Sequence, residues 1–240
     1  MNKPKAEIDR RGRVEPAPEP VTDEIGSAYF GRLAHDLRGP LSPLQTAAYL
    51  LRREDVGPQR QRELLDIIDR QAARLGSMLQ EMSDWMRASK GSVGARREPV
   101  SVPMLVELAC AELAAAGGAV DIPEALDGVE VTGDFQHLVQ MLATLVAYLR
   151  ARAGMDGISV GAALQGGRLT ITIEAAGPSG AASWEEAATL FTAPEPAPFD
   201  EGLGLRLIIA RAIAQAHGGG VTATVSGSGH AGIVIELPVN

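Results

Sequence analysis

The first part of the chain carries apolar residues at the spacing of a helix. Between about residues 23 and 53 they recur every three or four positions, so they line one side of a long helix. These residues are Leu33, Leu37, Leu41, Leu44, Ala48 and Leu51. The pattern ends at residues 54–58, Glu-Asp-Val-Gly-Pro, a sequence typical of a turn. The pattern therefore predicts one long helix followed by a short turn.

A second helical pattern runs from about residue 59 to residue 89. Its apolar positions alternate in steps of four and three, which is the heptad seam of helices that pack along their length. They are Leu64, Ile68, Leu75, Met78, Met82 and Trp85, with Gln71 in the one gap. Two long helices joined by a short turn form an antiparallel hairpin. One hairpin cannot cover both stripes, so we expect two copies to form a four-helix bundle. The alternative is a hairpin packed on the rest of its own chain.

Beyond residue 89 the pattern breaks into shorter pieces. Strands are expected at 99–102, 120–122, 129–131, 158–164, 168–174, 220–226 and 232–237, and helices at 103–116, 134–152 and 202–217. Helices and a mixed sheet in this order predict a two-layer α/β sandwich. The fold class is therefore α+β, a long helical hairpin followed by this sandwich.

The domain organisation follows from these patterns. A disordered tail (1–23), rich in Pro, Glu, Lys and Arg, precedes the hairpin (24–89). A linker with Gly, Ser and Arg (90–98) leads to the sandwich (99–240).

The composition limits the kind of core and the cellular compartment that can be expected. Of the 240 residues, 45% are hydrophobic and only 4% aromatic, so a core can form but must be aliphatic. The single cysteine, Cys110, excludes an intrachain disulfide and fits a reducing compartment. There is no apolar run of about 18 residues and no apolar signal core. We therefore expect no membrane span and a cytoplasmic location.

Charge divides the chain unevenly. Residues 1–97 hold 17 Lys and Arg against 14 Asp and Glu, whereas residues 98–240 hold 5 against 16. An acidic second half argues against nucleic acid as a partner. It also argues mildly against a bound triphosphate, which usually meets cationic side chains.

His35 is the first candidate for chemistry. It is two residues from both Leu33 and Leu37, which at about 100° per residue places it near the opposite side of the helix. An outward imidazole of this kind can act as a nucleophile. The carboxylate of Asp36, the next residue, can orient the ring or take its proton.

The run His35-Asp36-Leu37-Arg38-Gly39-Pro40-Leu41 resembles the phospho-accepting H-box of bacterial two-component histidine kinases, His-Glu/Asp-Leu-Arg-x-Pro-Leu. The resemblance implies that His35 carries a phosphoryl group, aided by Asp36. Proline bends a helix, so a bend is expected at Pro40. The docking surface for a regulator is expected on the same helix, at Arg38, Pro40, Leu41 and Leu44. Gly39 stands where the family often has Thr or Asn, so phosphatase activity by that route should be weak.

The second half resembles the Bergerat-type ATP-binding domain of the same kinases, and it ends its last helix with Ala-His-Gly-Gly (216–219). Several family nucleotide ligands are replaced. Two asparagines fall on Thr144 and Tyr148, and the adenine-binding aspartate falls on Ala175 in the run that contains Gly177. Only the last glycine signature persists, at Gly202 and Gly204. The resemblance thus implies ATP and Mg²⁺ binding that is lost or weak.

The remaining histidines, His137, His217 and His230, lack the spacing of a metal site, so we expect structural or surface roles and no metal.

Three functions stay open. The first is a phosphorelay protein that exchanges a phosphoryl group on His35 with receiver-domain response regulators or a hybrid kinase, without ATP. It would resemble the dimeric histidine phosphotransferases. The second is an ATP-dependent sensor histidine kinase with an unusual nucleotide site. The third is a non-catalytic pseudokinase that binds and inhibits a signalling partner. Retention of the H-box favours the first over the third, and loss of the nucleotide ligands favours it over the second.

Overall fold

The computed structural model describes residues 22–53, 56–89, 96–153, 157–175, 190–195, 202–225 and 231–239. Several sequence predictions fall outside these ranges. They are the tail apart from residues 22 and 23, most of the linker at 90–95, and two candidate residues, Gly177 and His230.

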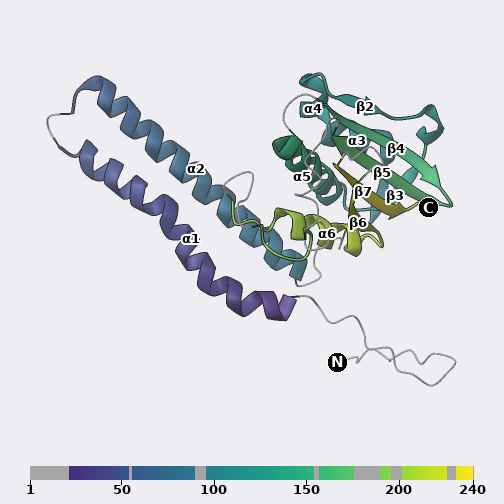
Figure 1. Ribbon diagram of the computed structural model, residues 1–240, viewed down its shortest axis with the longest axis horizontal. Coiled ribbons are helices and arrows are strands. Elements are labelled where there is room, and N and C mark those ends of the chain that lie inside the picture. Colours follow the sequence, from purple (N-terminus) through teal and green to yellow (C-terminus); the bar gives the residue numbers. More distant parts are fainter. Residues whose placement is uncertain are drawn as a thin grey trace.

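The predicted helical hairpin is present. Helix α1 (Thr22–Leu51) and helix α2 (Pro58–Ser89) lie side by side and antiparallel (Figure 1). Pro58 begins α2, where its missing N–H costs nothing. Helix α1 continues without interruption through Pro40 and Pro43. The buried positions of α2 include Leu64, Met78 and Trp85, which the predicted heptad seam contains.

The inward face of α1 differs in register from the predicted stripe. Leu33, Pro40 and Ala47, spaced by seven residues, are buried, whereas the predicted Leu41 is 38% exposed. The predicted Ala48 is only half-buried. The apolar stripe is wider than one seam, so the edge that carries Leu41 remains outside the hairpin interface.

The predicted sandwich is also present. Its five-stranded sheet has the order β2-β4-β5-β7-β6. The strands are β2 (Ala119–Asp121), β4 (Ile158–Gln165), β5 (Arg168–Ala175), β6 (Gly220–Val225) and β7 (Ala231–Pro238). Strands β2 and β4 pair in parallel and the others antiparallel, which gives the mixed sheet expected. Gly166 and Gly167 join β4 to β5 with positive φ angles of 57° and 77°, as a two-residue hairpin turn requires.

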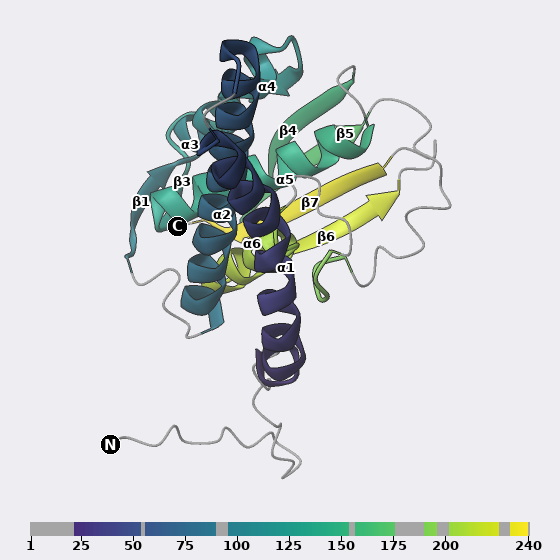
Figure 2. The ribbon, with the colours of Figure 1, turned by 90° about the vertical axis from the view of Figure 1, so that its left-hand side faces the viewer.

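The helices cover one face of this sheet. They are α3 (Val102–Ala109), α4 (Ala111–Ala115), α5 (Phe135–Ala153) and α6 (Arg206–Ala216). A short ladder of β1 (Glu98–Ser101) with β3 (Glu130–Gly133), and the 3₁₀ turn η1 (Glu124–Leu126), complete the fold. Helices α5 and α6 lie between the sheet and the hairpin (Figure 2).

Two predicted helices have different bounds. The helix predicted at 103–116 is divided at Cys110, whose φ of −102° and ψ of 7° are not helical. The helix predicted at 202–217 begins only at Arg206. The delay has a local cause, because Gly204 has a φ of +76° and cannot belong to a right-handed helix.

The core is aliphatic, as the composition predicted, and it extends into the hairpin. The predicted inward residues of α5 are fully buried: Leu138, Met141, Leu142, Leu145 and Leu149. Leu33, Met78 and Trp85 of the hairpin belong to the same buried cluster. The part of the hairpin distant from its turn therefore packs on the sandwich, as the alternative interpretation of the pattern required.

Candidate phospho-acceptor and nucleotide site

His35 lies on the exposed side of α1. Its side chain is 86% exposed, and Nδ1 is 3.3 Å from Oδ1 of Asp36. Donation by an Nδ1–H to this carboxylate leaves the lone pair on Nε2. In that tautomer the ring presents the Nε2 lone pair to solvent, and the outward position inferred from the helical spacing is confirmed.

The predicted docking residues do not share one environment. Arg38 and Leu41 are exposed and Leu44 is half-buried, but Pro40 is buried. Pro40 therefore does not belong to the exposed surface, contrary to the sequence prediction, because it lies in the buried seam of α1. A Cβ added to Gly39 would meet no atom within 4 Å.

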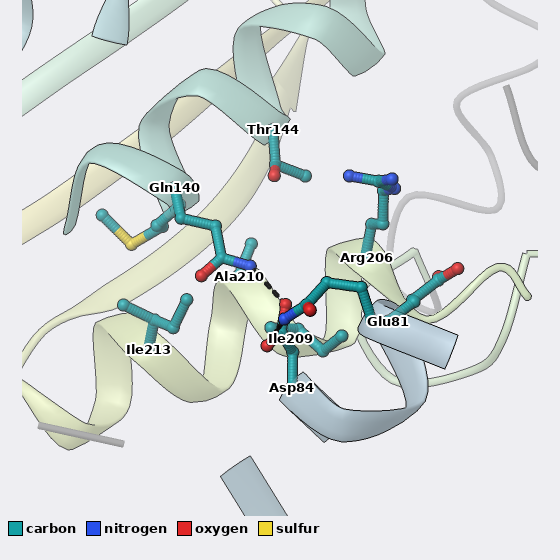
Figure 3. A pocket seen from close by; sticks show the side chains of 10 residues that line it. Glu81, Asp84, Gln140, Thr144, Arg206, Ile209, Ala210 and Ile213 are labelled. Carbon is teal, nitrogen blue, oxygen red and sulfur yellow. Dashed lines mark hydrogen bonds between the residues drawn. The ribbon is translucent and has the colours of Figure 1, made fainter. Parts of the chain in front are cut away.

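Thr144 lines a small cleft between α2, α5 and α6. The cleft has a volume of about 80 Å³, and Gln140 and Arg206 also line it (Figure 3). Small-molecule sites usually enclose about 300–1,000 Å³. Within the described residues this space is therefore small for a nucleotide.

Tyr148 and Ala175, which stand at two other positions where the resemblance implies nucleotide ligands, are both buried. Tyr148 is 2% exposed, and the guanidinium of Arg152 lies 5.3 Å from the centre of its ring. Burial raises the pKa of the Tyr148 hydroxyl, so the phenol stays neutral. Ala175 ends β5 and is 1% exposed, and its methyl group cannot accept a hydrogen bond. Neither side chain reproduces the metal-binding or adenine-binding group that the family has there.

The retained glycines lie in a loop before α6, Gly202 to Leu205. The backbone carbonyl of Gly204 accepts a 2.9 Å hydrogen bond from the N–H of Glu195. A Cβ on Gly204 would clash with the Glu195 backbone, and its positive φ also excludes most side chains. The structure thus gives Gly204 a backbone role that needs no ligand.

Glu81 of α2 contacts this loop, and sequence reasoning missed it. Its carboxylate is buried, with the residue 3% exposed. Oε2 accepts a 2.7 Å hydrogen bond from the Leu203 N–H, and Oε1 accepts a 2.5 Å bond from the Leu205 N–H. One signal was available, because an acidic residue stands among the apolar positions Met78, Met82 and Trp85 of the α2 seam.

A second polar contact joins the same two parts of the chain. Gln140 of α5 donates a 2.7 Å hydrogen bond to Oδ2 of Asp84 on α2 (Figure 3). Arg87 donates to the other oxygen of Asp84 at 2.6 Å. The hairpin and the sandwich are therefore held by carboxylates as well as by apolar packing.

His217 and His137 have structural roles. His217 is buried, its Nδ1–H donates to the Ile213 carbonyl at 2.7 Å, and its Nε2 accepts from the Asp134 N–H at 2.9 Å. Burial lowers the pKa of His217, so the ring is neutral. Nδ1 of His137 lies 3.1 Å from Oδ2 of Asp134, and Oδ1 of the same carboxylate accepts the backbone N–H groups of Gln136 and His137 at the start of α5.

Other reactive groups are few in the part of the chain that the structure describes. No three His, Cys, Asp or Glu side chains gather there at a metal-binding distance. Cys110 is buried, and burial raises the pKa of its thiol to about 11, so it is not a thiolate nucleophile. Among the described helices, none combines the length and the apolar character needed to cross a bilayer.

Comparison with known proteins matches both parts of this architecture. Residues 27–91 match the His Kinase A (phospho-acceptor) domain. The sensor protein KdpD of Mycobacterium tuberculosis is 28% identical over 228 residues, which are 90% of this chain but only 26% of KdpD. The chain thus spans about a quarter of the curated relatives that it matches.

Solved structures share the fold. The histidine kinase AdeS of Acinetobacter baumannii superposes with a TM-score of 0.61 and 17% identity, covering 86% of this chain and 98% of AdeS. The histidine kinase ThkA, solved in complex with the response regulator TrrA, gives a TM-score of 0.65 and 16% identity, covering 90% of this chain and 62% of ThkA.

Residues 27–91, with the exposed His35 in their first helix, therefore match the His Kinase A phospho-acceptor domain, and the chain has the fold of the histidine kinases AdeS and ThkA, a helical hairpin followed by an α/β sandwich.

Proposed function

We propose that the chain is a phosphorelay protein that accepts a phosphoryl group on His35 from a receiver-domain aspartate and passes it to another receiver. The exposed imidazole of His35, oriented by Asp36, is the observation that carries this proposal. The fold of the two-component histidine kinase core supports the same signalling class.

The transfer needs little from the protein beyond positioning. Nε2 of a neutral His35 attacks phosphorus in line with the bond to the aspartyl oxygen. The P–N bond forms as the P–O bond breaks, and the aspartate leaves as a carboxylate. An aspartyl phosphate is a mixed anhydride and already activated, so a correctly placed, neutral ring is the main requirement. Asp36 keeps the ring in the tautomer that exposes Nε2.

ATP is not part of this proposal. The side chain of Ala175 cannot accept a hydrogen bond from an adenine amino group. The guanidinium of Arg152 lies over the ring of the buried Tyr148. A lost hydrogen bond to a charged group costs about 1.5–3 kcal/mol, or about ten- to a hundredfold in affinity. We propose that ATP and Mg²⁺ bind weakly or not at all and that no cofactor is used.

A second candidate function is an ATP-dependent histidine kinase. The similarity to KdpD, which extends over 90% of this chain, favours it, because it includes the sandwich as well as the hairpin. In that case other groups, such as Thr144 and Arg206 at the cleft, would replace the missing ligands.

The proposed partners are a second copy of the chain and a receiver domain. Large apolar side chains remain exposed on the hairpin, at Leu41, Tyr49, Leu65 and Leu79. Leu65 and Leu79 are fourteen residues apart, so they lie on the same side of α2. A second hairpin would cover this stripe. The complex of ThkA with its response regulator supports a receiver partner.

The test is incubation of the chain with a receiver domain that carries a radiolabelled aspartyl phosphate. We expect acid-labile label on the wild-type chain and none on His35→Gln, because Gln lacks a nucleophilic ring nitrogen. A matched control is His137→Gln, which changes a histidine of the sandwich. Label that persists on His35→Gln would show that another residue accepts the phosphoryl group.

A further inference from the structure

The loop before α6 holds a carboxylate that comes from another part of the chain. Glu81, 122 residues before Leu203, accepts hydrogen bonds from the backbone N–H groups of Leu203 and Leu205 at 2.7 and 2.5 Å. Both carboxylate oxygens are used, one for each amide. Glu81 itself is 3% exposed, so water does not compete for these bonds.

The two hydrogen bonds give partners both to the buried carboxylate and to the backbone N–H groups before α6. A buried carboxylate is unfavourable unless hydrogen bonds replace its water shell. The first N–H groups of a helix have no partner within the helix and carry positive partial charge. Leu205 precedes the first residue of α6 and has no side-chain cap of its own. The carboxylate of Glu81, supplied by the hairpin, therefore holds the loop that leads into α6, including the N–H of its N-cap residue Leu205.

The contact lies at the junction between the hairpin and the sandwich. Glu81 shares the α2 surface with Met78 and Trp85, which are buried in the common core. Asp84, one helical turn further on, receives the hydrogen bond from Gln140 of α5. The loop before α6 is thus tied to α2 by Glu81, and α5 is tied to the same end of α2 by Asp84 (Figure 3 shows the Asp84 bond). Among the described residues, seven apolar residues of the hairpin lie in or against the common core, so these polar bonds act together with apolar packing.

We propose that Glu81 is an internal latch that holds the sandwich closed on the hairpin, and that release of its carboxylate from the Leu203 and Leu205 amides opens the two parts. In the closed form the glycine loop is occupied by the chain's own anion. Opening breaks both of these hydrogen bonds, and solvent has to replace them. The closed form is therefore favoured until another group binds either the Glu81 carboxylate or the two backbone amides. The latch does not depend on whether His35 exchanges its phosphoryl group with ATP or with a receiver.

The test compares Glu81→Gln with Glu63→Gln. Glutamine keeps the size of the side chain but has one acceptor oxygen in place of two and no charge. Glu63 is on the same helix, and its side chain is 48% exposed and paired with Arg60, three residues away. Hydrogen exchange at single amides and small-angle X-ray scattering are measured on the full chain.

We expect at least tenfold faster exchange at the Leu203 and Leu205 amides in Glu81→Gln, and a larger radius of gyration. Exchange of the β4, β5 and β7 amides should not change, and Glu63→Gln should match the wild type. If Glu81→Gln has wild-type exchange at both amides and a wild-type radius, the latch does not exist.

Global unfolding of Glu81→Gln would be recognised by fast exchange throughout the sheet. The decision then rests on the wild-type chain and on Glu81→Asp, whose carboxylate is one methylene shorter. Protected Leu203 and Leu205 amides in the wild type, with faster exchange confined to them in Glu81→Asp, would support the latch. Unprotected amides in the wild type would overturn it.

Discussion

Two carboxylates on the hairpin have opposite environments and correspondingly different tasks. Asp36 is one-third exposed and lies beside an imidazole that faces solvent, so it can orient a ring that reacts with an outside partner. Glu81 is buried and bonded to two amides of the same chain. Sequence spacing predicted the first, because the helical pattern alone places His35 outward. It did not predict the second, because the partners of Glu81 are over 120 residues away.

At Gly39, a polar side chain should add phosphatase activity toward a phosphorylated receiver. The family resemblance gives Thr or Asn at this position the role of placing a water, and a Cβ here meets open space. Gly39→Asn should also be neutral or slightly stabilising, since glycine in a helix interior costs about 0.5–1 kcal/mol relative to alanine. The measurement is the decay rate of the receiver aspartyl phosphate.

Gly76→Asn is the control for this change, because Gly76 is a helical glycine of α2 with equally open surroundings. The idea fails if Gly39→Asn and Gly76→Asn leave the decay rate equally unchanged.

At His217, a neutral ring should make stability depend on pH. Burial lowers the pKa of the native His217 below the usual value of 6.5, so the unfolded chain binds the proton more readily. The contribution of the neutral ring is therefore complete above about pH 6.5 and is lost as the pH falls from there toward the native pKa. Urea unfolding at several pH values measures this slope.

His217→Gln should remove that slope and destabilise the fold by about 1–3 kcal/mol, because the Asp134 N–H and the Ile213 carbonyl lose their buried partner. A wild-type free energy of unfolding that stays constant from pH 7.5 to pH 5.5 would contradict the assignment of a neutral His217.

At the scale of elements, periodicity predicted where helices and strands lie. It did not predict which residues of a wide apolar stripe are buried against neighbouring elements. Leu64, Met78 and Trp85 of the predicted α2 seam and the five predicted inward residues of α5 are buried, whereas the buried Glu81 of α2 was not predicted. The α1 stripe was predicted with Leu41 and Ala48 inside, whereas Pro40 and Ala47 are the buried residues. Helix starts that depend on a single positive φ, as before α6, also escaped the pattern.

The exposed stripe on α2 should control dimerisation. Leu65 and Leu79 are 45% and 55% exposed in one chain, so charges there do not disturb its core. The double variant Leu65→Glu and Leu79→Lys should be monomeric with unchanged helix content. Met78→Glu should instead unfold the chain, since Met78 is 1% exposed within the common core. Sedimentation equilibrium and circular dichroism separate these outcomes. A wild type that is already monomeric at micromolar concentration would remove the basis for the dimer.

At the scale of the whole molecule, the order of elements and the H-box were sufficient to predict a hairpin followed by a sandwich. They could not predict how the two parts pack together. That arrangement combines the packing of Met78 and Trp85 in the common core with the hydrogen bonds of Glu81 and Asp84, whose partners in the sandwich are distant in the sequence. The same limit applies to the nucleotide ligands. The replacement at Ala175 was visible in the sequence, whereas the stacking of Arg152 on Tyr148 was not.

The central claim is that His35 exchanges its phosphoryl group with receivers and not with ATP. The most direct measurement incubates the wild-type chain in parallel with γ-labelled Mg-ATP and with a receiver that carries labelled aspartyl phosphate. The account predicts label on His35 only in the second incubation, since the family resemblance puts Ala175 and Tyr148 at positions where two ATP ligands are expected. Label on His35 from ATP alone would contradict it and establish an ATP-dependent histidine kinase. Label in neither incubation would contradict it in favour of a non-catalytic binding protein.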